Sequence, residues 1–230
     1  MSLKCGILLL DKPSGATSHD MVDLVRRKFS YKKVGHAGTL DPMATGLLII
    51  LLGAFTKKSA HFSTLDKEYE ARLCLGISTN TADRLGKIVE KKDTSFLASA
   101  SGRIEEVFKT FAGEIQQVPP MYSAKKIKGK KLYEFARKGI EVVREPKTVF
   151  IQEIKIVDKA VPFIKFYVKC SKGTYIRQLA HDIGDRIGCG AHLDFLRRTK
   201  IGSFAVENAL SFEKLKCKKT LTDEDILQLS

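Results

Sequence analysis

The segment from Val34 to Gly53, VGHAGTLDPMATGLLIILLG, restricts the possible folds of this chain more than any other. Its second half, Leu47–Leu52, is a run of consecutive apolar residues. Such a run is long enough for a strand that is buried on both faces, and it is too short for an independent amphipathic helix. We therefore predict that Leu47–Leu52 is a central strand and that the rest of the chain is organised around it.

The polar loop before this strand carries an aspartate and a histidine, Asp41 and His36. Pro42 disfavours the helical region for Asp41, so the carboxylate is held on a stiff, extended turn. A stiff carboxylate near an imidazole, just ahead of a buried strand, is a candidate for nucleophilic or base catalysis. The alternative is that the Asp-Pro pair only forms a turn. The loop also contains glycines that permit close backbone approach, Gly35, Gly38 and Gly46.

Charge and length narrow the class of protein further. Forty Lys and Arg residues against 26 Asp and Glu give the 230-residue chain a net charge of +14, which indicates a polyanionic partner, most commonly nucleic acid. The alternative is a generally basic protein without such a partner.

The length of the chain suits one large domain, or one domain with an insertion. The five cysteines are scattered without any C-x-x-C pair, so we predict neither a disulfide framework nor a zinc site.

No part of the sequence approaches the roughly 20 apolar residues of a membrane-spanning helix. The N-terminal segment MSLKCGILLLDK has a short apolar run without a small-residue cleavage site after it, which is not typical of a signal peptide. We therefore expect a cytoplasmic protein that does not enter a membrane.

Residue periodicity predicts most of the regular elements. Thr17 and Asp20 have the spacing of a capping box, so we expect a helix to begin after Thr17. Apolar runs and alternating patterns predict further strands at 6–10, 69–75, 149–157, 163–170 and 193–201, with a hairpin at 78–90. Helical spacing predicts helices at 54–62, 104–111, 176–187 and 212–215. The acidic tail from Thr222 is expected to fray.

A basic segment, Gln117–Gly139, reads QVPPMYSAKKIKGKKLYEFARKG. Its adjacent prolines prevent regular structure at their position, and a lysine cluster lies between Tyr122 and Tyr133. Basic charge interleaved with aromatic rings is typical of a surface that contacts RNA. We expect this segment to bind RNA, together with Arg197 and Arg198 at the end of a predicted strand. The alternative is an exposed lysine loop.

Arg177 falls in the first turn of a predicted helix, where its positive charge opposes the helix dipole at a cost of roughly 0.3–1 kcal/mol. A cation that is unfavourable for its own helix suggests a function, such as pairing with a carboxylate. The alternative is a surface arginine whose charge is screened by water.

With these residues identified, the chain resembles the TruB-type tRNA pseudouridine synthases, relatives of the catalytic domain of eukaryotic dyskerin. The motifs that carry the resemblance cover most of the chain in the family's order: LDKPSGATS (Leu10–Ser18), GHAGTLDPMATGLL (Gly35–Leu48), KEYEARLCLG (Lys67–Gly76), QVPPMYSAKKIKGKKLYEFAR (Gln117–Arg137) and CSKGTYIRQLAHDIG (Cys170–Gly184). The sequence departs from the family pattern at Ala37, where threonine is usual, and at Asn80 and Leu85, in a turn that is usually richer in aspartate.

The resemblance implies roles for individual residues. Asp41 is then the catalytic aspartate, Arg177 is a second catalytic residue that pairs with it, and His36 inserts into the T loop to help expel the target base. Tyr69 stacks on the flipped uracil, and Lys12 and Leu196 line the pocket. The residues implied to bind the substrate are His36, Tyr69, Lys12, Tyr175, Leu196, Lys125, Lys126 and Lys128.

We therefore expect an α+β fold with a mixed, largely antiparallel central sheet flanked by helices. Residues 1–230 would form one catalytic domain with a basic, RNA-contacting insertion at about 116–146 and without a C-terminal PUA domain. The expected reaction is isomerisation of uridine to pseudouridine in the T loop of tRNA, at position 55. It needs no cofactor and no metal, because the base never leaves the pocket. The expected partner is the T arm of tRNA, and the expected state is a monomer.

The residues leave two other functions open. A non-catalytic RNA-binding protein or tRNA chaperone could keep the same fold and use only the basic surface, although Asp41 and its companion residues argue against it. A carboxylate glycosidase would also act at an anomeric carbon, but it needs a second carboxyl group, and none is placed as clearly as Asp41. Asp41 could act either as a nucleophile at the sugar or as a base.

Overall fold

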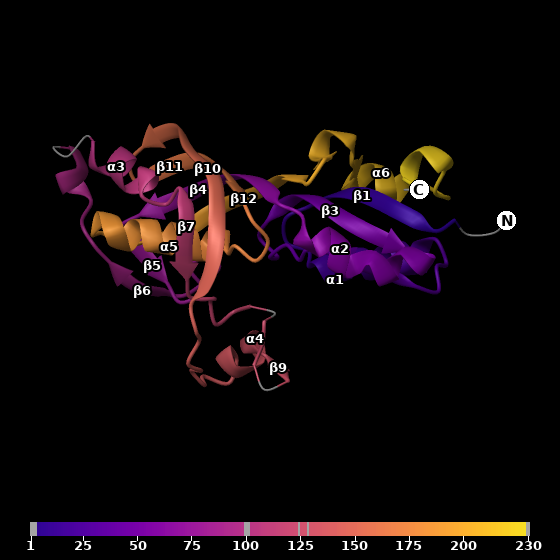
Figure 1. Ribbon diagram of the computed structural model, residues 1–230, viewed down its shortest axis with the longest axis horizontal. Helices are drawn as coiled ribbons and strands as arrows, with labels where there is room; N and C mark the ends of the chain where they lie inside the picture. Colours follow the sequence, from indigo (N-terminus) through magenta and orange to yellow (C-terminus); the bar gives the residue numbers. More distant parts are fainter. Residues whose placement is uncertain (1–3, 99–101, 124, 128, 229–230) are drawn as a thin grey trace. The chain divides into compact units, whose positions relative to one another are not determined.

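The computed structural model describes residues 4–98, 102–123, 125–127 and 129–228 (Figure 1). The chain divides into two compact units. Unit 1 comprises Met1–Tyr69 and Leu196–Ser230, and unit 2 comprises Glu70–Phe195. The strands β4 (Lys67–Leu75) and β12 (Ala191–Ile201) contribute residues to both units.

Unit 1 is built on strands in the order β14-β1-β3-β12, with β2 also paired to β3 and β13 to β12. β1 and β3 are antiparallel, whereas β14 runs parallel to β1 and β12 runs parallel to β3. Each residue of Leu47–Leu52 in β3 is 0% exposed, so the prediction of a central strand is confirmed. The elements are β1 (Gly6–Lys12), α1 (Ser18–Lys28), β2 (Val34–Ala37), β3 (Thr45–Leu52), η1 (Gly53–Lys58), α2 (Ser59–Thr64), β13 (Phe204–Ala205), η3 (Val206–Asn208), β14 (Leu210–Ser211), α6 (Phe212–Cys217) and η4 (Asp223–Asp225).

Two apolar layers cover the two faces of β1 and β3, because successive side chains of a strand point to opposite faces. On one face, Leu8 and Ile50 pack with Val25 of α1 and Leu215 of α6. On the other face, the alternate residues of both strands pack with Phe62 of α2. This double burial explains why β3 is apolar without interruption.

Of the helices predicted in unit 1, α1 begins as expected, whereas the helix expected at 54–62 has a different form. The capping box that precedes α1 is confirmed, since Thr17 Oγ1 accepts the amide of Asp20 at 3.0 Å and the Asp20 carboxylate accepts the amide of Thr17 at 2.7 Å. The single helix expected at 54–62 is instead a 3₁₀ turn, η1, followed by α2 from Ser59.

The expectation that the C-terminal tail frays from Thr222 is wrong. Thr222 and Asp225 form a second capping box, and Lys218 Nζ lies 2.7 Å from Asp225 Oδ2. The backbone of Leu227 also exchanges two hydrogen bonds with Ile7 of β1, at 2.8 and 2.9 Å. The tail is therefore fastened to unit 1 by a strand-like contact that its acidic composition did not indicate.

In unit 2 the strand order is β12-β4-β11-β10-β7, and β10 is antiparallel to both of its neighbours, β11 and β7. α3 packs on this sheet through Phe108, whose ring centroid lies 5.5 Å from that of Phe166 on β11. The predicted end of α5 is confirmed by Gly188, which has a φ of 105°. The remaining elements are β5 (Ile77–Thr79), β6 (Ile88–Lys91), η2 (Ser95–Ala98), α3 (Arg103–Lys109), β7 (Gly113–Gln117), β10 (Lys147–Ala160), β11 (Phe163–Cys170) and α5 (Ile176–Ile187).

The basic segment lies between β7 and β10 and begins where their ladder ends, at the pair Gln117 and Lys147. It contains β8 (Lys126–Ile127), β9 (Lys130–Lys131) and α4 (Leu132–Ala136), and it projects from the rest of unit 2 (Figure 1). α4 and the small β8–β9 hairpin were not predicted.

The strands and helices together give an α+β fold with a mixed, largely antiparallel sheet flanked by helices, as predicted. Within the residues that the structure describes, no helix has the length and apolar character needed to cross a membrane. Over the same residues, no group of three or more His, Cys, Asp or Glu side chains is arranged to hold a metal ion.

Candidate active site

The loop that carries Asp41 connects β2 to β3 in unit 1, and it is held at several points by the segment between β1 and α1. Ser18, the first residue of α1, accepts the amide of Leu40 on its Oγ at 2.9 Å and donates the same hydroxyl to the carbonyl of Leu40 at 3.2 Å. Both backbone groups of the residue before Asp41 are thus fixed by one buried serine. Asp41 itself is half-buried, and its carbonyl accepts the amide of Ala44 at 3.0 Å.

Two further contacts reach the far side of the Asp41 turn. The amide of Gly15 donates to the carbonyl of Pro42 at 2.8 Å, and Ser14 Oγ donates to the carbonyl of Met43 at 3.2 Å. The motif at Leu10–Ser18 therefore supports the backbone on both sides of Asp41. This local support makes the carboxylate a preorganised group, which is what catalysis by a fixed carboxylate requires.

Lys12, at the end of β1, is completely buried and donates its ammonium group to backbone carbonyls. The distances from Nζ are 2.8 Å to Pro13 O, 2.7 Å to Ala16 O and 3.4 Å to Pro42 O. Burial lowers the pKa of Lys12 from 10.5 to about 8; Asp41 opposes this shift and Arg198 adds to it. The structure therefore gives Lys12 a part in holding the Asp41 loop, and its predicted contact with the substrate stays a prediction.

The expectation that Arg198 contacts RNA is wrong. Arg198 is only 1% exposed, so it is not available to contact a phosphate. Its guanidinium instead donates to carbonyls at both ends of the Asp41 loop, among them Gly38 and Leu47. The neighbouring Arg197 is partly exposed, but its two terminal nitrogens are paired with Asp11 at 2.7 and 3.0 Å.

His36 lies on β2 opposite Ile50 of β3 and is half-buried. Burial lowers the pKa of His36, and the positive charge of Arg198 lowers it further, so the imidazole is neutral near pH 7. Its Nδ1 atom is buried and has no hydrogen-bond partner among the residues described. A neutral imidazole with an unused ring nitrogen is compatible with the predicted contact to RNA.

Tyr69 and Leu196 are the other predicted pocket residues of unit 1, and both are largely buried, at 7% and 5% exposure. Tyr69 lies on β4, and Leu196 lies on β12, where its carbonyl accepts Thr45 Oγ1 at 3.4 Å. Unit 1 thus contains Asp41 together with Lys12, His36, Tyr69 and Leu196.

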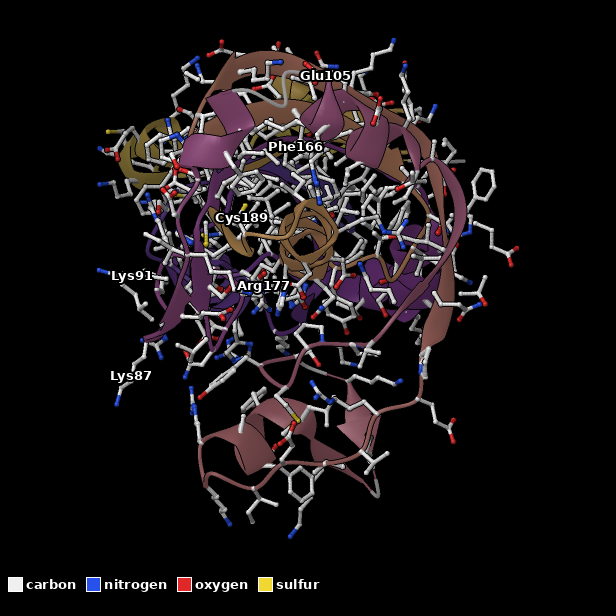
Figure 2. The ribbon with its side chains drawn as sticks, turned by 90° about the vertical axis from the view of Figure 1, so that its left-hand side faces the viewer. Lys87, Lys91, Glu105, Phe166, Arg177 and Cys189 are labelled. Atoms are coloured by element: carbon white, nitrogen blue, oxygen red, sulfur yellow. The ribbon has the colours of Figure 1, made fainter. Side chains whose placement is uncertain are left out.

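Arg177 belongs to unit 2, where it lies in the first turn of α5 and is 4% exposed, while Lys87 and Lys91 point outward (Figure 2). Its guanidinium donates to Thr81 O at 3.0 Å and to Tyr122 O at 2.9 Å. The alternative of a solvated surface arginine is therefore wrong. Because Asp41 belongs to unit 1, the pairing of Asp41 with Arg177 stays a prediction.

A carboxylate also faces Arg177 within unit 2. Asp83 Oδ2 lies 3.4 Å from Arg177 Nη1, and the Asp83 side chain accepts the hydroxyl of Thr81 at 2.8 Å and the amide of Leu85 at 3.0 Å. The turn that departs from the family pattern at Asn80 and Leu85 therefore keeps a buried aspartate at Asp83.

Gln117 is a residue that the sequence analysis did not single out for the site. Its side chain is 1% exposed, and it accepts the amide of Tyr175 at 2.7 Å and donates to the carbonyl of Tyr175 at 3.1 Å. Tyr175 is the N-cap residue of α5, two positions before Arg177, and has no side-chain cap of its own. The only sequence signal was that Gln117 lies two positions before a pair of prolines.

The predicted lysines of the basic segment are described to different extents. Lys125 is half-buried, and its carbonyl accepts the amide of Leu132 at 2.9 Å. Lys126 pairs with Lys131 across the β8–β9 hairpin through the backbone. Lys128 lies outside the described residues. Their contact with RNA stays a prediction.

Comparisons with known proteins identify the family of the chain. The N-terminal domain model of the TruB family pseudouridylate synthases matches residues 26–176, and the tRNA pseudouridylate synthase B C-terminal domain matches residues 177–229. The tRNA pseudouridine synthase B of Alkaliphilus oremlandii is 48% identical over 222 residues, which are 96% of this chain and 73% of the relative. The protein of the same name from Clostridium tetani is 46% identical over 210 residues, 91% of this chain and 72% of the relative.

Solved structures with a similar fold are chains of Cbf5 complexes. A chain in a Cbf5-Nop10-Gar1 complex has a TM-score of 0.70 and 32% identity, and the match covers 90% of this chain and 52% of that one. A chain of the archaeal box H/ACA sRNP Nop10-Cbf5 complex has a TM-score of 0.66 and 29% identity, covering 91% and 52%. The present chain thus spans about half the length of these solved chains. From the extent of the matched family model and the identity to the curated relatives, the chain belongs to the TruB family of pseudouridylate synthases.

Proposed function

We infer that this chain is a tRNA pseudouridine synthase that isomerises uridine to pseudouridine, and we propose that its target is position 55 in the T loop. The relatives named tRNA pseudouridine synthase B support the activity. The observation that carries the proposal is the Asp41 loop, whose backbone is fixed before and after the carboxylate by Ser18 and Gly15. A rigidly presented carboxylate serves a reaction at a sugar, whereas a protein that only binds RNA gains nothing from it.

The reaction follows from the chemistry of the substrate. The target uridine is flipped out of its stack at a cost of a few kcal/mol, which is offset by stacking on an aromatic ring, for which we propose Tyr69. With Asp41 acting at the sugar, the bond from the anomeric carbon to N1 breaks, the uracil turns in the pocket, and a bond from C5 to the same carbon forms. The proton lost from C5 is balanced by one gained at N1. Atoms and electrons balance without a co-reactant, so the reaction needs none.

We propose that RNA is held by electrostatic attraction, with the basic segment between β7 and β10 contributing most. The chain carries a net charge of +14, and Lys130, in strand β9 of this segment, is exposed to solvent. His36 would enter the T loop in its neutral form, which avoids the cost of burying a second cation near Arg198. We further propose that the enzyme acts as a monomer in the cytoplasm.

A single-turnover assay on T-arm RNA and on whole tRNA tests this proposal. Asp41→Asn should abolish pseudouridine formation and leave the dissociation constant for tRNA within a few-fold of the parent, because the lost charge lies at the reaction rather than at a phosphate. If parent and Asp41→Asn bind tRNA equally and neither forms pseudouridine, the protein is an RNA-binding protein of the same fold. Mapping pseudouridine in tRNA from cells that lack the protein would locate the modified position.

A further inference from the structure

Arg198 is a buried cation in unit 1 for which sequence patterns gave no catalytic role. Its guanidinium makes three contacts with backbone carbonyls: Nε to Leu47 O at 2.8 Å, Nη2 to Gly38 O at 2.9 Å and Nη1 to Thr39 O at 3.4 Å. Gly38 and Thr39 lie shortly before Asp41, and Leu47 lies after it, where β3 has begun. One planar group therefore contacts the backbone at both ends of the loop that carries Asp41.

The backbone of Arg198 contacts the same loop. Arg198 is paired with Gly46 in the parallel ladder between β12 and β3. Gly46 has a φ of +100°, and a Cβ atom there would lie 2.3 Å from the carbonyl oxygen of Arg198 and 2.7 Å from its nitrogen. The glycine is thus required both by its dihedral angle and by the close approach of β12. The register of this ladder is what turns the Arg198 side chain toward the loop.

We propose that Arg198 is a positioning residue for the reaction, which closes the loop Gly38–Leu47 at its base and thereby fixes the carboxylate of Asp41. The proposal rests on the function proposed above. An arginine suits this task because its planar fork directs donors toward two sides at once, whereas a lysine ammonium is a single point of charge on a flexible chain. The carbonyls of Gly38, Thr39 and Leu47 accept hydrogen bonds from the buried guanidinium, which donates only.

The size of the effect follows from the demands of the chemistry. A misplacement of a reacting group by about 1 Å can lower a rate about 100-fold. Ser14, Gly15 and Ser18 hold the tip of the loop near Asp41, but among the contacts described it is Arg198 that joins the loop's first carbonyls to the start of β3. Loss of that link would let the two ends move apart while the core beneath them stays packed.

The first test separates positioning from stability. Arg198→Met removes every donor, Arg198→Lys keeps the charge, and Leu215→Ala is the matched control because it opens a cavity in the core below α6, away from the Asp41 loop. Single-turnover rates are measured at saturating tRNA and at a temperature where all variants are folded. We expect a loss of about 100-fold for Arg198→Met and a smaller loss for Arg198→Lys, with the rate of Leu215→Ala close to that of the parent. The dissociation constant for tRNA should change less than threefold, because Arg198 is 1% exposed.

The second test needs no activity. Hydrogen exchange at the amides of Leu40 and Ala44 reports the two ends of the Asp41 turn, since these amides donate to Ser18 Oγ and Asp41 O. Exchange at both amides should be at least tenfold faster in Arg198→Lys than in Leu215→Ala, when each variant is measured at the same number of degrees below its own melting temperature. Unchanged exchange, or a rate for Arg198→Lys and Arg198→Met equal to that of Leu215→Ala, would overturn the proposal. An inactive parent would instead refute the proposed function, while the exchange data would still decide whether Arg198 orders the loop.

Discussion

Arg177 and Asp83 form a buried ion pair in unit 2, with 3.4 Å between Nη1 and Oδ2. The two residues are 4% and 6% exposed. The pair joins the first turn of α5 to the loop between β5 and β6, and the same guanidinium also holds the carbonyl of Tyr122 at the root of the basic segment. Because these contacts satisfy Arg177, its unfavourable position at the start of α5 is compensated within the unit.

Arg177→Ala should therefore destabilise the protein by about 3–5 kcal/mol, since it leaves the Asp83 charge buried without this partner. Arg177→Lys should recover part of the loss but not all, because lysine lacks the planar fork. Urea unfolding of both variants measures this. Arg186→Ala, at an exposed position on the same helix, is the control and should cost less than about 1 kcal/mol. A cost for Arg177→Ala as small as that of Arg186→Ala would contradict the account.

The predicted pairing of Arg177 with Asp41 has a separate signature in the rate of the reaction. If Arg177 orients the carboxylate of Asp41, Arg177→Ala should lower the single-turnover rate at saturating tRNA, and Arg177→Lys should recover only part of it, because lysine lacks the planar fork. The rates are measured at a temperature where both variants are folded. A rate for Arg177→Ala equal to that of the parent would contradict the pairing.

Gln117 should contribute to the free energy of unfolding, although its side chain is neutral. Gln117→Leu would remove the partner that the structure describes for the partly buried amide of Tyr175, at a cost of about 1–3 kcal/mol, whereas the carbonyl of Tyr175 keeps its hydrogen bond from the amide of Leu179. Gln116→Leu is the matched control, because Gln116 is the exposed neighbour on β7 and bonds only the side chain of Thr148 among the contacts described. Chemical denaturation should separate the two variants by more than 1 kcal/mol if the prediction holds. Equal stabilities would mean that water replaces Gln117 at Tyr175.

Lys12 should give the stability of the protein an unusual dependence on pH. Its pKa is about 8 in the folded protein, against an ordinary value of 10.5, so between these values the unfolded chain binds more protons than the folded one. The free energy of unfolding should therefore rise with pH in this window, by up to about 1.4 kcal/mol per pH unit from this group. Lys12→Met removes the group, so the difference between parent and variant, measured by urea unfolding from pH 7.5 to 10, isolates it. A difference that stays constant over this range would contradict the shift.

Binding of tRNA should depend steeply on salt. If several phosphates are neutralised, the dissociation constant should rise by about two orders of magnitude or more between roughly 50 and 200 mM salt. Replacing Lys125 and Lys130 by glutamine should weaken binding and reduce the salt slope, while the single-turnover rate at saturating tRNA stays near that of the parent. Lys165→Gln is the control, because Lys165 lies on β11 and contacts Asp158 at 3.5 Å. An affinity insensitive to salt, or an equal effect of Lys165→Gln, would exclude the basic segment as the main RNA contact.

The central strand, the capping box and the end of α5 were predictable because each depends on neighbours in the sequence. Leu47–Leu52 needed only its apolar composition, and Thr17 and Asp20 needed only their spacing. The same holds for Gly188, which ends α5 because glycine adopts a positive φ without strain. The resemblance to a known family added the candidate roles of Asp41 and its companions, which stay predictions.

The tertiary structure alone decided which charged and polar side chains are buried and what they contact. Arg197 and Arg198 are adjacent and chemically identical, yet one pairs with Asp11 and the other closes the Asp41 loop, because strand register sends neighbouring residues to opposite faces. Gln117 reaches Tyr175, and Leu227 reaches Ile7, across long separations in the chain. Local patterns carry no information about such contacts, since they form only when distant segments are brought together by the fold. The sequence determined the elements and the loop that carries Asp41, and the packing of those elements determined how that loop is held.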